Sequence, residues 1–187
     1  MSKTLKRILL GLAAVLVIIQ FFRIDKTNPP IDSGQEFMAV TAPPADVAQL
    51  IHDACYDCHS HETEYPWYTN VAPLSWWIAD HVKEGRKHLN FSVWGTYEQK
   101  KKAHKAEECA EEINKKEMPL TSFLPAHPEA RLTDEQRTRL SDWFMALSKG
   151  KDITERVREG DPGTTPAMNE AGKESDEATE HEHEEEE

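Results

Sequence analysis

The sequence predicts an all-α domain that follows an apolar helix at the N-terminus. Apolar residues recur at the three- and four-residue spacing of a helix in four segments after residue 42, and helix start and stop signals flank these segments. No segment shows the alternation of apolar and polar residues that a half-buried strand requires. The chain has 187 residues, a length that accommodates one domain with terminal appendages.

The first apolar stretch predicts a membrane anchor. Residues 8–22 are apolar except for Gln20, and three basic residues precede them. A basic flank of this kind places the N-terminus in the cytoplasm and the rest of the chain outside. The stretch is short for a spanning helix, so it also fits the apolar part of a cleaved signal peptide. Because no small-x-small cleavage site follows Phe22, we predict an uncleaved, single-pass transmembrane signal anchor over residues 1–24 in the cytoplasmic membrane.

A linker and the first helix of the domain follow. Residues 25–42 are rich in Pro, Asp, Thr and Ser, which is typical of a linker. The pair Pro43-Pro44 is a favourable helix start, and the predicted domain covers residues 43–150. Beyond this helix, residues 62–73 form a loop rich in aromatic residues. The apolar face of the first helix is predicted to contain Val47, Leu50, Ile51 and Ala54.

Three more helices complete the predicted domain. One covers residues 75–89, and another covers residues 96–116 and stops before Pro119, because the residue before a proline is disfavoured in a helix. The last begins at Thr133, where a glutamine three residues later forms a capping box, and ends at Gly150. The core-facing residues of the last two helices are predicted to be Ala106, Cys109, Ala110, Ile113, Leu140, Trp143, Phe144 and Leu147.

The charge distribution separates a C-terminal tail from the domain. The chain carries a formal net charge of −12. Residues 161–187 hold 11 acidic residues and one lysine. Because residues 151–187 contain few apolar residues, we predict an acidic, disordered tail. An acidic chain gives no support for a nucleic-acid partner, which would require a basic surface.

The most informative motif of the sequence is the stretch Cys55-Tyr56-Asp57-Cys58-His59. C-x-x-C-H is the attachment signature of a c-type haem. Residues three and four apart share one face of a helix, so both thiols and the imidazole point the same way. We predict one covalently bound haem c, with thioether bonds to Cys55 and Cys58 and with His59 as the proximal ligand of the iron.

The sixth position of the iron calls for a second axial ligand. A methionine opposite the histidine is the usual choice in cytochromes c. Met118 is the predicted distal ligand, because it follows the third helix of the domain and lies in a non-helical turn before Pro119. The alternative is a methionine that only fills the core. Four histidines are further alternatives, of which His88 fits best, namely His81, His88, His104 and His127.

The three cysteines allow other interpretations. Two of them belong to the motif, which leaves no pair for a structural disulfide. Cys109 lies on an apolar helix face, where a cysteine behaves as a small buried hydrophobe. A zinc site built from Cys55, Cys58, His104 and Cys109 lacks a second closely spaced ligand pair. We therefore favour haem attachment.

The motif and several other stretches together resemble a known family. They are Cys55-Tyr56-Asp57-Cys58-His59-Ser60, Tyr65-Pro66-Trp67-Tyr68, Ala72-Pro73-Leu74-Ser75-Trp76-Trp77, His88-Leu89-Asn90-Phe91-Ser92 with Trp94, Glu117-Met118-Pro119-Leu120, His127-Pro128 and Leu132-Thr133. With them, residues 45–147 resemble the small bacterial haem-binding-domain proteins. This resemblance implies a cytochrome c-like fold with a single haem, often tethered to a membrane. The acidic tail departs from the family pattern.

These observations predict a membrane-tethered monohaem c-type cytochrome that transfers single electrons outside the cytoplasmic membrane. Its expected partners are the membrane and an unidentified redox protein, and the haem domain is expected to face the periplasm or exterior. An electron carrier of this kind is not an enzyme. Alternative interpretations are a haem-based gas or redox sensor and a peroxidase-like enzyme with an open sixth site. Core packing is the expected role of most of the aromatic residues. A further hypothesis is that some of them, such as Trp77, contact the haem propionates, together with Arg86 and Asn90.

Overall fold

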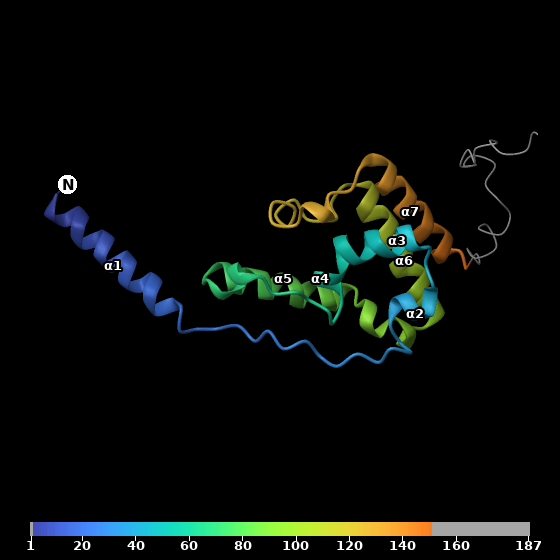
Figure 1. The fold of residues 1–187 in the computed structure, drawn as a ribbon, viewed down its shortest axis with the longest axis horizontal. Coiled ribbons are helices and arrows are strands. Elements are labelled where there is room, and N and C mark those ends of the chain that lie inside the picture. Colours follow the sequence, from blue (N-terminus) through green and yellow to red (C-terminus); the bar gives the residue numbers. More distant parts are fainter. Residues whose placement is uncertain (1, 151–187) are drawn as a thin grey trace, which may run out of the picture. The chain divides into compact units, whose positions relative to one another are not determined.

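The computed structural model describes residues 2–150, and the predicted acidic tail lies outside them. All regular elements in this part of the chain are helical, which confirms the all-α prediction (Figure 1). Short helical turns connect the α-helices at His52–Tyr56, Trp67–Asn70, Phe91–Thr96 and Pro128–Ala130. The α-helices are α1 (Lys3–Ile19), α2 (Phe37–Thr41), α3 (Ala45–Ile51), α4 (Asp57–His59), α5 (Leu74–His88), α6 (Gln99–Asn114) and α7 (Asp134–Ser148).

The N-terminal apolar stretch folds as α1 and is shorter than predicted. The helix has 17 residues and ends at Ile19, so it spans about 26 Å at 1.5 Å per residue. The hydrocarbon core of a bilayer is roughly 30 Å thick. Among the described residues, no helix combines the length and apolar character that crossing a membrane requires. The predicted transmembrane helix in residues 1–24 is therefore wrong, because α1 stops before the apolar pair Phe21-Phe22.

The segment predicted as a linker, residues 25–42, contains α2 and contacts the domain. The carboxylate of Glu36 caps this helix by accepting hydrogen bonds from two backbone N–H groups at 2.8 and 3.2 Å. The side chain of Phe37 is fully buried and lies against two other core aromatic rings, with centroids 4.6 and 4.8 Å away. This part of the segment therefore contributes directly to the hydrophobic core.

The predicted first helix is present and contains an unusual turn. α3 passes through a π-helical turn over His52–Tyr56 into α4, and the residues at both junctions keep helical backbone angles. The side chains of Val47 and Ile51 are fully buried and attach this helix to the core. Single π-helical turns occur frequently at functional sites. This turn contains the first motif cysteine, Cys55, and ends two residues before the second, Cys58.

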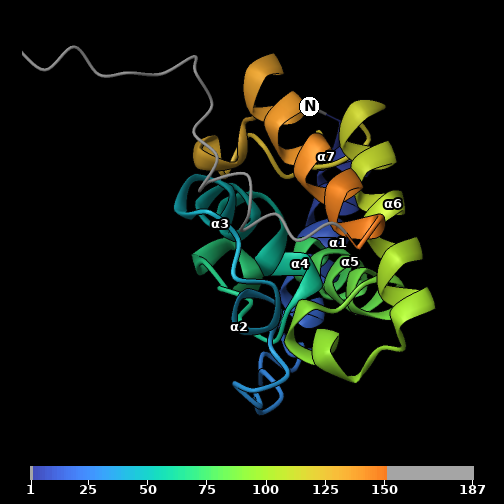
Figure 2. The ribbon, with the colours of Figure 1, turned by 90° about the vertical axis from the view of Figure 1, so that its right-hand side faces the viewer.

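The last three α-helices, α5 to α7, fall where the sequence predicts them. α6 and α7 run side by side (Figure 2). The capping box at the start of α7 is formed as predicted, because Thr133 and Gln136 exchange side-chain to backbone hydrogen bonds. Buried apolar residues of α6 and α7 pack against those of α2, α3 and the turn Phe91–Thr96 in one core cluster.

The tryptophans of the domain divide into core and surface residues. Trp94 is only 1% exposed and belongs to the core. Trp67, Trp76 and Trp77 are 78%, 39% and 45% exposed. Core packing therefore does not account for these three side chains. The indole N–H of Trp76 instead donates a hydrogen bond to the Phe22 carbonyl at 2.8 Å.

Candidate functional site

The motif residues lie together on the helix formed by α3, the π-helical turn and α4. Cys55 and Cys58 are half-buried, and the described part of the chain, which holds all three cysteines, contains no disulfide. Burial raises the pKa of the Cys55 thiol to about 12 and that of the Cys58 thiol to about 11. Charge repulsion contributes in the same direction, from the other thiol at Cys55 and from Asp57 at Cys58. Both groups are therefore neutral thiols in an apolar environment.

The imidazole of His59 is held by the end of α5. Its Nδ1 lies 3.0 Å from the Gly85 carbonyl oxygen and 3.2 Å from the Leu89 carbonyl oxygen. Because both neighbours of Nδ1 are acceptors, the ring proton must be on Nδ1. Nε2 is then unprotonated and has a free lone pair. Burial lowers the pKa of the ring, against the opposing effect of these hydrogen bonds. The side chain is therefore a neutral imidazole whose Nε2 is available to a metal.

The approach of α5 to the motif is unusually close. A Cβ atom at Gly85 would lie 2.6 Å from the Cys58 carbonyl oxygen, closer than real Cβ atoms come to other atoms. The neighbouring Arg86 reaches across the motif and donates hydrogen bonds to the Ser60 carbonyl at 2.7 Å and the Thr63 hydroxyl at 2.9 Å. Sequence analysis did not single out Gly85, because only the packing of two helices shows why a side chain is excluded there.

Met118 lies in a turn that other residues hold in place. Its backbone N–H donates to the Glu112 carbonyl at 3.3 Å, and its carbonyl accepts a hydrogen bond from Arg137 Nη1 at 2.8 Å. The same Nη1 contacts the Ile113 carbonyl at 3.2 Å, near the end of α6. The side chain of Met118 is half-buried. Its role as the distal ligand stays a prediction. Sequence analysis did not single out Arg137, whose side chain holds the backbone of this turn.

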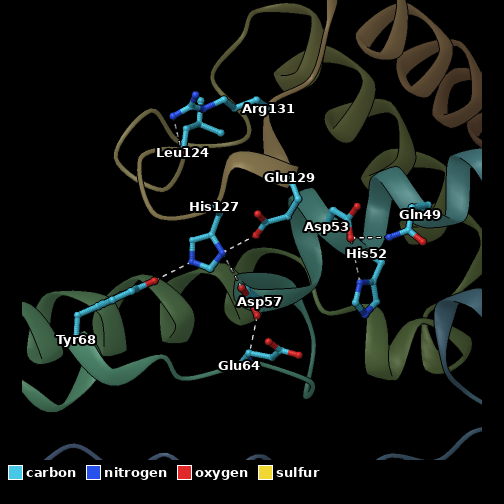
Figure 3. A network of polar contacts seen from close by, with 10 residues as sticks. All are labelled: Gln49, His52, Asp53, Asp57, Glu64, Tyr68, Leu124, His127, Glu129 and Arg131. Carbon is cyan, nitrogen blue, oxygen red and sulfur yellow. Dashed lines mark hydrogen bonds and ion pairs between the residues drawn. The ribbon is translucent and has the colours of Figure 1, made fainter.

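His127 takes part in a polar network beside the motif (Figure 3). Its Nε2 is 2.8 Å from the Tyr68 hydroxyl, and its Nδ1 is 3.0 Å from a carboxylate oxygen of Glu129. Nδ1 also lies 3.8 Å from a carboxylate oxygen of Asp57, inside the motif. Burial raises the pKa of Asp57 above its ordinary value. The network joins the loop before α7 to the motif helix.

Arg86 and Asn90, the two predicted propionate contacts, have protein partners. Arg86 also donates to the Asn28 side-chain oxygen at 2.7 Å, in addition to its two contacts beside the motif. The Asn90 side chain contacts His61 Nε2 at 2.9 Å and accepts from the Ser92 N–H at 3.0 Å. These interactions give both residues a structural role in holding the segments around the motif.

The residues present fit a haem of the c type by the chemistry of the donor set. The motif supplies two thiols in an apolar setting and one imidazole with a free Nε2. The same core, against which Cys55 packs, contains a buried donor: Trp143 is 4% exposed, and its indole nitrogen has no hydrogen-bond partner among the described residues. Within residues 2–150, no cluster of three or more His, Cys, Asp and Glu side chains is arranged to hold a metal ion alone.

Fold and site together define an all-α protein with a C-x-x-C-H motif on a core helix. The model of one protein family, described as a haem-binding domain, matches residues 14–146 of this chain. The match covers more than half of the 187 residues. The chain therefore belongs to the haem-binding domain family, as its resemblance to these proteins predicts. No curated protein and no solved structure matches it.

Proposed function

We propose that this protein carries one covalently attached c-type haem and transfers single electrons outside the cytoplasm. Membership of the haem-binding domain family supports a haem cofactor. The C-x-x-C-H stretch supports covalent attachment. Since c-type haem is attached outside the cytoplasm, an exported location follows from the proposal. When bound, the haem supplies an iron atom that takes up and releases one electron.

The protein's own residues have distinct roles in this proposal. Cys55 and Cys58 hold the porphyrin through thioether bonds, which their burial protects from solvent. His59 binds the iron through Nε2, and Met118 completes the coordination. The protein adjusts the reduction potential through the identity of these ligands, the burial of the site and hydrogen bonds to the ligands.

The single observation that carries the proposal is the arrangement at His59. The Nδ1 atom is 3.0 and 3.2 Å from two backbone carbonyl oxygens, so the ring is fixed in one tautomer and one orientation. Metal-binding histidines commonly donate their second ring N–H in this way. The arrangement lies on the same helix as both thiols, which is the combination that covalent haem attachment requires.

The proposal is tested by producing the full-length chain in a bacterium that exports and matures c-type cytochromes. We expect the denatured protein to stain for haem peroxidase activity on a gel, with an intact mass increased by one haem. The Cys55→Ala and Cys58→Ala variants should each lose a thioether bond, and the double variant should lose all covalent haem. The Cys109→Ala variant is the matched control and should keep the full haem mass. An uncoloured wild-type protein without added mass would overturn the proposal.

Coordination at the sixth position distinguishes electron transfer from gas sensing and peroxidase chemistry. We expect six-coordinate spectra in the ferric and ferrous states, with little change on addition of carbon monoxide. The Met118→Ala variant should lose the sulfur-to-iron charge-transfer band and should bind carbon monoxide. A wild-type protein that binds carbon monoxide readily would contradict an electron-carrier role.

A further inference from the structure

We propose that Gly85 is a positioning residue that sets the reduction potential of the haem by holding the end of α5 against His59. The inference rests on the function proposed above. It concerns a residue that contacts the iron ligand only through its backbone. Three features of the structure support it: the steric requirement for glycine, the direction of the α5 carbonyl groups, and the anchoring of α5 by Arg86.

The first feature is the missing space for a side chain. A Cβ atom at Gly85 would lie 2.6 Å from the Cys58 oxygen, 3.2 Å from its carbonyl carbon and 3.3 Å from its Cβ. The nearest two of these are backbone atoms, which cannot rotate away. Glycine inside a helix costs about 1 kcal/mol relative to alanine. Its presence in α5 is therefore explained by the close approach and not by helix formation.

The second feature is the pair of carbonyl oxygens that the close approach of α5 places beside His59. Gly85 and Leu89 lie at the C-terminal end of α5, where the helix dipole gives the last carbonyl groups partial negative charge. The Gly85 carbonyl also accepts the Leu89 N–H at 2.9 Å. Both carbonyl oxygens are within hydrogen-bond distance of His59 Nδ1. Acceptors at Nδ1 make Nε2 a stronger electron donor to a bound metal. Stronger donation favours ferric over ferrous iron and so lowers the reduction potential.

The third feature is the anchor that keeps α5 in this position. Arg86, the next residue, donates three hydrogen bonds of 2.7 to 2.9 Å to groups at Asn28, Ser60 and Thr63. The contacts to Ser60 and Thr63 hold α5 on the segment that directly follows the motif, and the contact to Asn28 joins it to the segment before α2. An alanine at position 85 would have to displace α5 against this anchor. The Cβ distance to the Cys58 oxygen must grow from 2.6 Å to at least the 3.4 Å of ordinary contact.

The Gly85→Ala variant tests the inference, with Gly95→Ala as the matched control. A Cβ atom at Gly95 would be equally crowded, at 2.2 Å from the side-chain oxygen and 2.9 Å from the Cα of Gln35. Gly95 lies outside the contacts of the motif, so both variants disturb packing and only one disturbs His59. In holo-protein with full haem mass, we expect Gly85→Ala to shift the reduction potential upward and Gly95→Ala to leave it unchanged. An equal potential in wild type and Gly85→Ala overturns the inference.

A measurement on the wild type keeps the inference testable when Gly85→Ala does not fold. In the ferrous, diamagnetic holo-protein, we expect NMR to show a slowly exchanging His59 Nδ1 proton with a nuclear Overhauser contact to the Gly85 α-protons. A rapidly exchanging Nδ1 proton without that contact overturns the inference. A wild-type protein without covalent haem overturns the proposed function as well, whereas loaded wild type with an unchanged variant potential overturns the role of Gly85 alone.

Discussion

Two regions of the molecule hold the two predicted iron ligands in different ways. The His59 region comprises residues 55–61 and 82–92, and the Met118 region comprises residues 115–131. Backbone atoms and buried rings define the first, with a helix approach that excludes any side chain at position 85. Backbone hydrogen bonds to the end of α6, together with side-chain contacts at partly exposed positions, hold the second. We conclude that the core holds His59, the predicted proximal ligand, whereas Met118, the predicted distal ligand, depends on a few attachments near the end of α6.

Phe91 shows how the His59 region is joined to the core. Its ring is fully buried and stacks on Tyr56, with the ring centroids 5.3 Å apart. It also meets the ring of Phe37 at 4.6 Å and the imidazole of His59 edge-on at 6.4 Å. A substitution of Phe91 therefore disturbs both the packing of the core and the surroundings of His59.

Replacing Phe91 by alanine is expected to have the largest effect. Removal of a fully buried phenylalanine should lower the free energy of unfolding by about 3–5 kcal/mol, through lost burial and the cavity left behind. The matched variant is Phe123→Ala in the Met118 region, where the half-buried ring stacks on His127 at 3.8 Å. Loss of that pair should cost roughly 1 kcal/mol. Urea denaturation measures the free energy of unfolding of both variants, with the dependence on urea concentration expected to stay the same. Similar losses for the two variants would refute the difference between the regions.

Arg137 offers a second way to separate the regions, because it holds the Met118 turn from α7. The Arg137→Ala variant loses hydrogen bonds to the carbonyl groups of Met118 and Ile113. Charged donors of this kind contribute about 1.5–3 kcal/mol each, so we expect a total loss of roughly 2 kcal/mol after water replaces part of the interaction. The holo-protein should also show a weakened sulfur-to-iron band.

Arg139→Ala is the control for this prediction, two residues further along α7. Its side chain pairs with Asp46 at 3.0 Å, and both groups are more than half exposed. An exposed pair contributes about 0–1 kcal/mol. We expect this variant to leave the sulfur-to-iron band unchanged and to alter stability only slightly. If Arg137→Ala also kept the full band, Arg137 would have no role in placing Met118.

Local patterns predicted most of the helices and the motif. The capping box at Thr133 depends on residues three apart, and the spacing of Cys55, Cys58 and His59 depends on one helix face. Such features are encoded within a few residues. The length of α1 was overestimated because the apolar run continues through Phe21 and Phe22, whereas the helix ends at Ile19.

The supporting contacts of the site could not be predicted from local patterns. Gly85 acts on a residue 26 positions away, and Arg137 acts on one 19 positions away. Periodicity also did not indicate which tryptophans of α5 are exposed, because Trp76 and Trp77 occupy an end of the helix beyond the core. The sequence therefore indicates the ligands more clearly than the residues that position them.

The smallest predicted effect concerns the turn that leads to Met118. Lys116 follows the end of α6 with a φ of 62°, in the left-handed region that favours glycine. Its ammonium group pairs with Asp134 at 2.7 Å, at largely exposed positions. The Lys116→Gly variant removes the backbone strain, worth about 1 kcal/mol, together with an exposed pair worth about 0–1 kcal/mol. We expect a net gain in stability of a few tenths of a kcal/mol.

Lys116→Ala separates the two contributions, because alanine removes the ion pair and keeps the strained backbone. We expect this variant to be slightly less stable than wild type in low salt and equal to it in high salt, where the exposed pair is screened. Thermal unfolding of the three proteins at two salt concentrations gives the comparison. A glycine variant less stable than the alanine variant would show that the turn is not strained.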